Sequence, residues 1–366
     1  MIEADLVPGA PHPREARRLV GQAEAEAALL DAMGSGRLHH GWLLAGPRGV
    51  GKATLAYRAA RALLARDRPT SLDLPADDPV ARRIRAGSEP RLAVLRREWD
   101  ASKERLPEVI GVDAVRSLIA RMSLSAADGG RRAVIVDAAD EMNPQAANAL
   151  LKLLEEPPGR TTLFLVAHRP SALVPTIRSR CRVLRLRPLD PAEMAEALGR
   201  DDAEALAALS GGSVGEALRL AEGGGPALYG EVVALLATMP GMDRAAALAL
   251  AEGASGRGSE GRRDLTVRLI ETALGRLALA GVAGPLPPAA ADEAATFGRL
   301  APGPGAARVW AEAQAGLGDR LRQGLAVNLD PATLLLDILR RIDETAARAV
   351  RPARSAPHDR AADAPA

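Results

Sequence analysis

The sequence predicts an α/β protein: a parallel-sheet domain of the P-loop type, then a small helical lid domain, then a larger all-α domain. Two observations carry this prediction. From Leu19 to about Arg187, short apolar runs alternate with segments of helical periodicity, the pattern of a parallel sheet covered on both faces. After Asp190-Pro191 the strand-like runs end, and only amphipathic helical segments follow.

The predicted domain boundaries lie where the composition changes. We expect the P-loop-like sheet domain at residues 1–188, the helical lid at 189–225 and the larger helical domain at 226–346. The glycine-rich run 223–226 predicts a linker. The Pro-, Arg- and Ala-rich residues 347–366 predict a disordered tail.

Composition excludes several classes of protein. The 366 residues give room for two or three domains, and an apolar content of 47% suffices for real cores. No run reaches the length of a membrane span, and residues 1–18 lack the apolar core of a signal peptide, so we expect a cytoplasmic protein. The single cysteine, Cys181, excludes an internal disulfide and a cysteine zinc site. A formal charge of +2 provides no global attraction for nucleic acid.

Apolar runs and capping residues place the elements of the sheet domain. Asp113 and Asn143 are the expected N-caps of two helices. The predicted strands are 42–45, 92–95, 133–136, 162–167 and 183–186, and the predicted helices are 23–33, 52–64, 113–122 and 144–154. Residues 67–90 have little periodicity and predict an exposed excursion.

The rest of the chain predicts helices only. Three belong to the lid and four to the larger domain: 194–198, 203–209, 214–221, 228–236, 265–279, 306–315 and 332–342.

A phosphate-binding P-loop stands between the first predicted strand and the second helix. Glycines of such a loop let backbone N–H groups converge on phosphate oxygens, while its lysine neutralises their charge. The candidate nucleotide-binding residues are Gly46, Gly49, Gly51 and Lys52, within Gly-Pro-Arg-Gly-Val-Gly-Lys-Ala.

The last position of the motif departs from the pattern. Ala53 stands where a Ser or Thr hydroxyl should hold Mg²⁺ against the β and γ phosphates. Thr54 is a poor substitute, since one step along a helix turns a side chain by about 100°. We therefore expect Mg²⁺ to be held poorly.

The second nucleotide element is an apolar strand that ends in Asp137. In an active ATPase this aspartate coordinates Mg²⁺ through water, and a glutamate directly after it orients the attacking water. Here Ala138 follows, and Asp140 and Glu141 lie beyond the strand end. Alternatively, Asp137 only caps the following turn. In either case the base is missing.

Arg180 is the candidate catalytic residue, although it would act on another subunit. An arginine at a domain rim can reach a neighbour's nucleotide and stabilise charge on the transferring phosphoryl group. The alternative is a solvated basic edge, which the residue pattern alone favours. The same segment also contains Arg178, Arg182, Arg185 and Arg187.

Several motifs together resemble the bacterial clamp-loader AAA+ proteins, and within them the delta-prime subunit family of DNA polymerase III. They are residues 38–44, the P-loop, the helix end Leu-Leu-Lys-Leu-Leu-Glu-Glu-Pro-Pro at 150–158, and Ser179-Arg180-Cys181. The resemblance is dense from about residue 20 to 188 and thin after that.

The resemblance implies an AAA+ domain, a lid and a helical collar that packs into a ring with other subunits. Delta-prime subunits are the rigid member of a five-subunit loader, beside motor and delta subunits. That assembly opens the β sliding clamp onto primed DNA. By this resemblance Arg180 is an arginine finger that acts in trans.

The family's motor subunits carry a γ-phosphate-sensing arginine in a Gly-Ser-x-Arg pattern, where this chain has Gly215. Together with Ala53 and Ala138, Gly215 is the third position at which a group needed for ATP hydrolysis is missing. We expect a stator-like component of the DNA polymerase III holoenzyme that needs no cofactor and binds ATP or ADP without effective hydrolysis. The alternative is an active AAA+ ATPase motor of a clamp loader or related DNA-remodelling machine, using Thr54 and Asp140. A relic whose Arg180 touches nothing is a third reading.

No metal site is expected. Many clamp-loader AAA+ proteins carry a four-cysteine zinc module after the P-loop helix, where this chain has residues 67–90. His39 and His40 are expected to point apart, with no third ligand near in sequence. Cys181 reads as a small packed side chain rather than a nucleophile.

Overall fold

A computed structural model describes residues 3, 6–124, 130–256, 258–326 and 330–350. The chain divides into two compact units, Met1–Glu222 and Gly223–Ala366. The predicted boundaries at 188, 225 and 346 stay predictions. From residue 351 on, the predicted tail lies outside the described residues.

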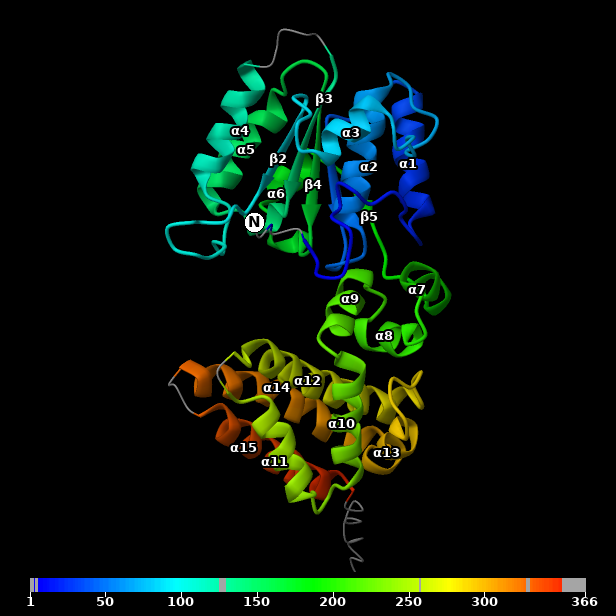
Figure 1. Cartoon of the computed structure of the whole chain (residues 1–366), viewed down its shortest axis with the longest axis vertical. Coiled ribbons are helices and arrows are strands. Elements are labelled where there is room, and N and C mark those ends of the chain that lie inside the picture. The colour runs from blue at the N-terminus through cyan, green and yellow to red at the C-terminus, as the bar shows by residue number, and fades with distance from the viewer. Residues whose placement is uncertain (1–2, 4–5, 125–129, 257, 327–329, 351–366) are drawn as a thin grey trace, which may run out of the picture. The chain divides into compact units, whose positions relative to one another are not determined.

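The first unit is built on a five-stranded parallel sheet, which confirms the predicted fold class (Figure 1). The strand order is β2-β3-β4-β1-β5, so β1 and β3 flank β4, and β5 lies at one edge. All five strands fall where the apolar runs predicted them: β1 (Gly41–Ala45), β2 (Leu92–Arg96), β3 (Arg132–Asp137), β4 (Thr161–Ala167) and β5 (Arg182–Arg185).

Helices cover both faces of the sheet (Figure 1). Alternate residues of β1 show the division: Trp42 packs in the core under α1 (Ala23–Gly34) and α2 (Lys52–Ala65). Leu43 packs in the opposite core, under α4 (Val112–Leu124), α5 (Pro144–Glu155) and α6 (Pro175–Ser179). Successive side chains of a strand point to opposite faces, and both faces are buried, which explains the continuous apolar runs.

The prediction of an irregular excursion at 67–90 is wrong for part of the segment. Residues Pro79–Arg85 form α3, whose Val80 and Ile84 are buried in the core beside α2. The side chain of Asp78 caps this helix by accepting from Val80 N at 2.8 Å. The frequent Pro, Asp and Arg residues of this segment masked a short amphipathic helix of about two turns.

The predicted N-cap Asp113 is also wrong. Helix α4 begins at Val112, and Asp113 lies in its first turn, where it pairs with Arg116 at 3.3 Å. The predicted cap of α5 is confirmed, because the Asn143 side chain accepts from Ala146 N at 2.8 Å.

The three predicted lid helices are confirmed, and they belong to the first compact unit. They pack against one another and end before Gly223: α7 (Pro191–Leu198), α8 (Ala203–Ser210) and α9 (Val214–Glu222).

The second unit is all helical in its described part, and the four predicted helices are present. Two further helices, α11 (Arg244–Gly253) and α13 (Glu293–Leu300), were not predicted. The expected linker at 223–226 is wrong at its end, because Gly225 and Pro226 already belong to α10 (Gly225–Ala237). The helices are α10 (Gly225–Ala237), α11 (Arg244–Gly253), α12 (Glu260–Ala283), α13 (Glu293–Leu300), α14 (Pro304–Ala326) and α15 (Pro331–Ala349). No helix among the described residues is long and apolar enough to cross a bilayer.

Candidate functional site

A cavity of about 330 Å³ lies where the P-loop, the lid and the N-terminal segment meet. Residues Arg48 to Thr54 form one wall, and Asp137 and His168 come from the carboxyl ends of β3 and β4. Helix α9 contributes Val214, Gly215, Leu218 and Arg219. Pockets of this size hold small ligands. The apolar part of the lining includes Val7, Ala10, Pro11, Leu19, Val20, Leu189 and Leu218.

The P-loop glycines are required by close approaches of the chain. Gly46 has a φ of 154°, and a Cβ there would lie 2.4 Å from the carbonyl oxygen of Leu186. Gly49 has a φ of 74°, and its Cβ would lie 2.3 Å from Ser213 Oγ. Gly51 precedes α2, so the N–H groups of the first helical turn face the cavity end of the loop.

Lys52 is fixed inside the loop. Its Nζ donates to the carbonyls of Gly46, at 2.7 Å, and Pro47, and the residue is only 3% exposed. Burial lowers the Lys52 pKa to about 8, against the opposing effect of the Asp137 and Asp140 carboxylates. The ammonium is therefore placed to meet an anion, but it holds its proton only weakly above neutral pH.

The arrangement of the acidic residues at and after the end of β3 agrees only in part with the one predicted from the sequence. Asp137 lines the cavity at the strand end, followed by buried Ala138. Asp140 folds back, and its side chain, 2% exposed, accepts from the backbone N–H of His168 and of Arg169, each at 2.9 Å. Glu141 pairs with two arginines, Arg48 and Arg97. Both carboxylates therefore bind groups of the protein itself.

His168 was not singled out from the sequence. It follows β4 directly and lines the cavity, and no described residue hydrogen-bonds its buried Nδ1. Burial lowers the His168 pKa to about 3, assisted by the positive charges of Lys52 and Arg48, so the ring is neutral at physiological pH. Its position directly after a predicted strand could have indicated a site residue, because the carboxyl ends of neighbouring parallel strands meet at one edge of the sheet.

The lid lies directly on the P-loop. Ser213 Oγ donates to the carbonyl of Arg48 at 2.8 Å, and Gly215 N donates to the carbonyl of Gly49 at 3.0 Å. A Cβ on Gly215 would lie 2.9 Å from Gly49 Cα. A residue with a side chain at position 215 therefore requires the lid to move away from the loop.

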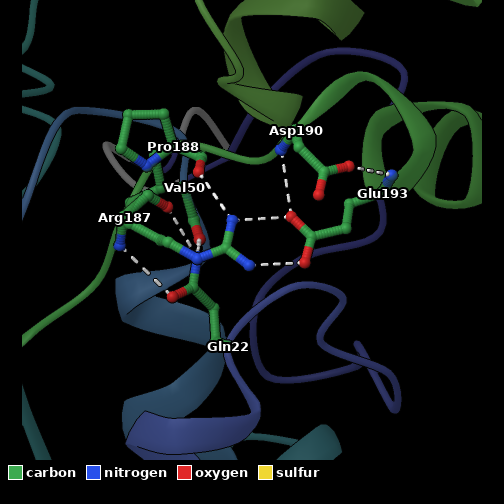
Figure 2. A network of polar contacts seen from close by, with 6 residues as sticks. All are labelled: Gln22, Val50, Arg187, Pro188, Asp190 and Glu193. Carbon is green, nitrogen blue, oxygen red and sulfur yellow. Dashed lines mark hydrogen bonds and ion pairs between the residues drawn. The ribbon is translucent and has the colours of Figure 1, made fainter.

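A polar network fixes the connection between the sheet and the lid (Figure 2). The buried Gln22 amide donates to the carbonyl of Arg187 at 2.7 Å and accepts from Arg187 N at 3.3 Å. The Arg187 guanidinium binds both carboxylate oxygens of Glu193, at 2.6 and 2.7 Å. Glu193 and Asp190 also form the capping box of α7. The first lid helix is thus bonded to the end of the sheet.

Arg180 lies apart from this cavity, which it does not line. It follows α6, and its side chain is 37% exposed. Its guanidinium pairs with Glu155 at 2.7 Å and donates to the Thr176 carbonyl at 3.1 Å. The group is therefore held at the surface of the unit, partly open to solvent.

Two smaller expectations meet different outcomes. Burial raises the pKa of the Cys181 thiol to about 12, so it carries no nucleophilic thiolate at neutral pH. The expectation that His39 and His40 point apart is wrong, since their rings stack with centroids 4.3 Å apart. In the described ranges, no group of three or more His, Cys, Asp or Glu side chains is placed to hold a metal ion.

Comparisons with known proteins bear on the sheet domain. Residues 21–190 match the family model described as DNA polymerase III, delta subunit. The chain is 42% identical over 204 residues to DNA polymerase III subunit delta' of Pseudomonas aeruginosa, which covers 53% of this chain and 60% of that one. It is 35% identical over 201 residues to the subunit of the same name in Escherichia coli, at 53% and 58% coverage. The chain thus spans about three fifths of the length of these relatives.

More distant similarities extend to other proteins. The DNA polymerase III subunit gamma/tau of Mycobacterium bovis is 32% identical over 188 residues, 51% of this chain and 31% of that one. Among solved structures, a DNA polymerase III gamma subunit-related protein of Thermotoga maritima is 20% identical, with a TM-score of 0.39 over 89% of this chain and 99% of that chain.

Proposed function

Because residues 21–190 match the family model described as DNA polymerase III, delta subunit, we propose that the chain is a stator-like subunit of the bacterial clamp loader. In this proposal it works in the cytoplasm, in a hetero-oligomeric ring with motor and delta subunits. The ring opens the β sliding clamp and places it on primed DNA. The likeness to relatives named delta' supports this assignment over that of a motor.

The subunit does not hydrolyse its own nucleotide. The contact between Gly215 and Gly49 is the observation that carries this proposal, because the lid position where motors have a sensing arginine has no space for a side chain. Ala53 supplies no hydroxyl for Mg²⁺, and Ala138 supplies no carboxylate for the attacking water.

The same pocket retains the groups of an anion-binding site. The N–H groups at the start of α2 and the ammonium of Lys52 face a cavity large enough for a small ligand. We propose that ATP or ADP binds there with its phosphates on Gly46 to Lys52 and with Asp137 nearby. No cofactor is required for the structural role.

The catalytic contribution goes to a neighbour. Arg180 is the proposed trans-acting arginine finger, and its partly exposed side chain outside its own nucleotide cavity supports this role. Glu155 and the Thr176 carbonyl orient it, which reduces the cost of ordering a long side chain at a subunit boundary.

The active-motor alternative receives no support from the site. Thr54 lines the cavity, but the Asp140 carboxylate is already committed to two backbone N–H groups. Using Asp140 as the catalytic base would leave those N–H groups without partners, at a cost of roughly 1–3 kcal/mol each.

Reconstitution tests the proposed function. The chain is mixed with gamma/tau and delta subunits from the same bacterium, and complexes are resolved by size-exclusion chromatography with light scattering. We expect one stable hetero-oligomer that loads β clamps on primed DNA, and no loading when this chain is omitted. Full loading without the chain, or failure to enter the complex, would contradict the proposal.

A further inference from the structure

The edge strand β5 has one side without a backbone partner. It pairs with β1 alone, and Leu186 N donates to the Ala45 carbonyl at 2.8 Å. In a strand, the N–H and C=O groups of one residue point to the same side, and successive residues alternate. Val183 and Arg185 therefore direct their backbone groups away from the sheet, and no described residue hydrogen-bonds to them on that side.

The residues on either side of this open stretch have hydrogen-bond partners for their backbone groups. At one end, Cys181 N donates to the Arg178 carbonyl at 3.3 Å. At the other end, the side-chain amide of Gln22 both donates to and accepts from the backbone of Arg187 (Figure 2). Gln22 occupies the place that a peptide group of a sixth strand would take. These two bonds show that the backbone of Arg187, just beyond β5, pairs with an amide group on this side.

The side chains along the stretch are basic and apolar. Val183 is 48% exposed, which is unusual for a large apolar side chain on a strand of this sheet. Arg182 and Arg185 are exposed, and neither has a carboxylate partner among the described residues. Arg182 stacks over the Trp42 ring at 5.2 Å, which holds its charge beside the edge. By contrast, Arg187 is neutralised by Glu193.

We propose that the open side of β5 binds an extended acidic segment of a partner protein, which adds as a sixth strand. Its backbone pairs with Val183 and Arg185. Because alternate side chains of β5 point to opposite faces, one carboxylate meets Arg182 on one face, and a second carboxylate meets Arg185 on the other face, where a small apolar side chain also covers Val183. Main-chain pairing of this kind gives affinity, while alternate side chains give specificity. None of these residues lines the nucleotide cavity, and Arg180 lies two residues before the start of β5. The proposal does not depend on the stator role.

Phosphates of nucleic acid would also be attracted to these arginines, but they would leave the backbone groups unpaired. The probe is therefore a fluorescein-labelled peptide of repeated Glu-Glu-Val, which places glutamates on both faces of an added strand. Labelled oligothymidylate of similar length tests the nucleic-acid alternative. Binding of each to the full-length protein is followed by fluorescence anisotropy at about 50 mM salt, where screening is weak. A peptide with Lys in place of Glu controls for charge.

We expect saturable binding of the acidic peptide and none of the basic one. The double change Arg182→Glu and Arg185→Glu should weaken it roughly tenfold or more, while Arg116→Glu, a reversal at an exposed arginine of α4, should leave it unchanged. Val183→Pro removes an outward N–H without touching the bonds to β1 and should weaken binding roughly fivefold. Circular dichroism confirms that each variant is folded.

Hydrogen exchange reads the backbone pairing directly and covers the case in which Val183→Pro fails to fold. With saturating acidic peptide, the amides of Val183 and Arg185 should exchange at least tenfold more slowly in the unaltered protein. The proposal would be overturned if the acidic peptide does not bind, or if it binds without protecting these two amides. It would also be overturned if the peptide does not bind while oligothymidylate does, with an affinity that Val183→Pro leaves unchanged.

Discussion

Ser213 Oγ donates a 2.8 Å hydrogen bond to the carbonyl of Arg48, and so joins the start of the last lid helix to the middle of the P-loop. Two residues further on, Gly215 N bonds to the carbonyl of Gly49. These two bonds hold the lid on the loop through backbone groups of the loop.

Restoring the missing arginine should not restore a motor. In Gly215→Arg the new Cβ would lie 2.9 Å from Gly49 Cα, so the lid must shift and both bonds are strained. We expect a loss of roughly 1–3 kcal/mol of stability, or several degrees in melting temperature by calorimetry, with no gain of ATPase activity. Gly34→Ala, at a helix end with open space around it, is the control and should change little. A stable variant with steady ATP turnover would refute this reading.

The amide of Gln22 should matter more than an average buried glutamine. Gln22→Ala leaves the backbone N–H and C=O of Arg187 without their partner and should destabilise the protein by about 1–3 kcal/mol. Faster hydrogen exchange in α7 should accompany the loss, because Arg187 connects to Glu193. Gln145→Ala, at an exposed position of α5, serves as the matched control. Equal melting temperatures for the two variants would contradict the importance of the network.

Arg180→Ala should slow hydrolysis at the adjacent motor site by roughly 10³-fold or more in a reconstituted loader. The rate of clamp loading should fall with it, while assembly on a sizing column stays intact. Arg178→Ala, two residues away and also exposed, is the control and should preserve both rates. If Arg180→Ala retains clamp- and DNA-stimulated ATPase and normal loading, the finger hypothesis is wrong and the relic reading gains.

The Lys52 pKa of about 8 predicts a pH dependence of phosphate binding. Only the protonated amine attracts an anion, so ADP affinity should be constant below about pH 7 and fall as the pH rises through 8 toward 9. Above the pKa, the limit is about tenfold per pH unit. Titration calorimetry measures it. Lys52→Arg keeps its charge throughout this range and should remove the dependence. A flat profile for the unaltered protein would place the anion elsewhere.

The sheet could be read from the sequence because both of its faces are buried, so each strand is a continuous apolar run flanked by turns. The P-loop could be read because its glycines are dictated by backbone contacts, such as that of Gly46 with Leu186. Helix α3 was not predicted because its roughly two turns carry only three buried residues, among many charged ones.

The close contact of the lid with the P-loop could not be predicted from the sequence. Gly215 reads as the loss of an arginine, yet the structure gives a reason that depends on residues 166 positions earlier, namely Gly49. His168 and the return of Asp140 to its backbone N–H depend on tertiary neighbours in the same way. Local patterns identify strands and loops, but they do not identify which ends meet.

Phosphate release by the isolated chain with saturating Mg²⁺ and ATP is the most direct test of the central claim that this pocket does not hydrolyse. We predict no release above that of Lys52→Ala, at any protein concentration. Steady turnover on the order of one per second, abolished by Lys52→Ala, would contradict the account.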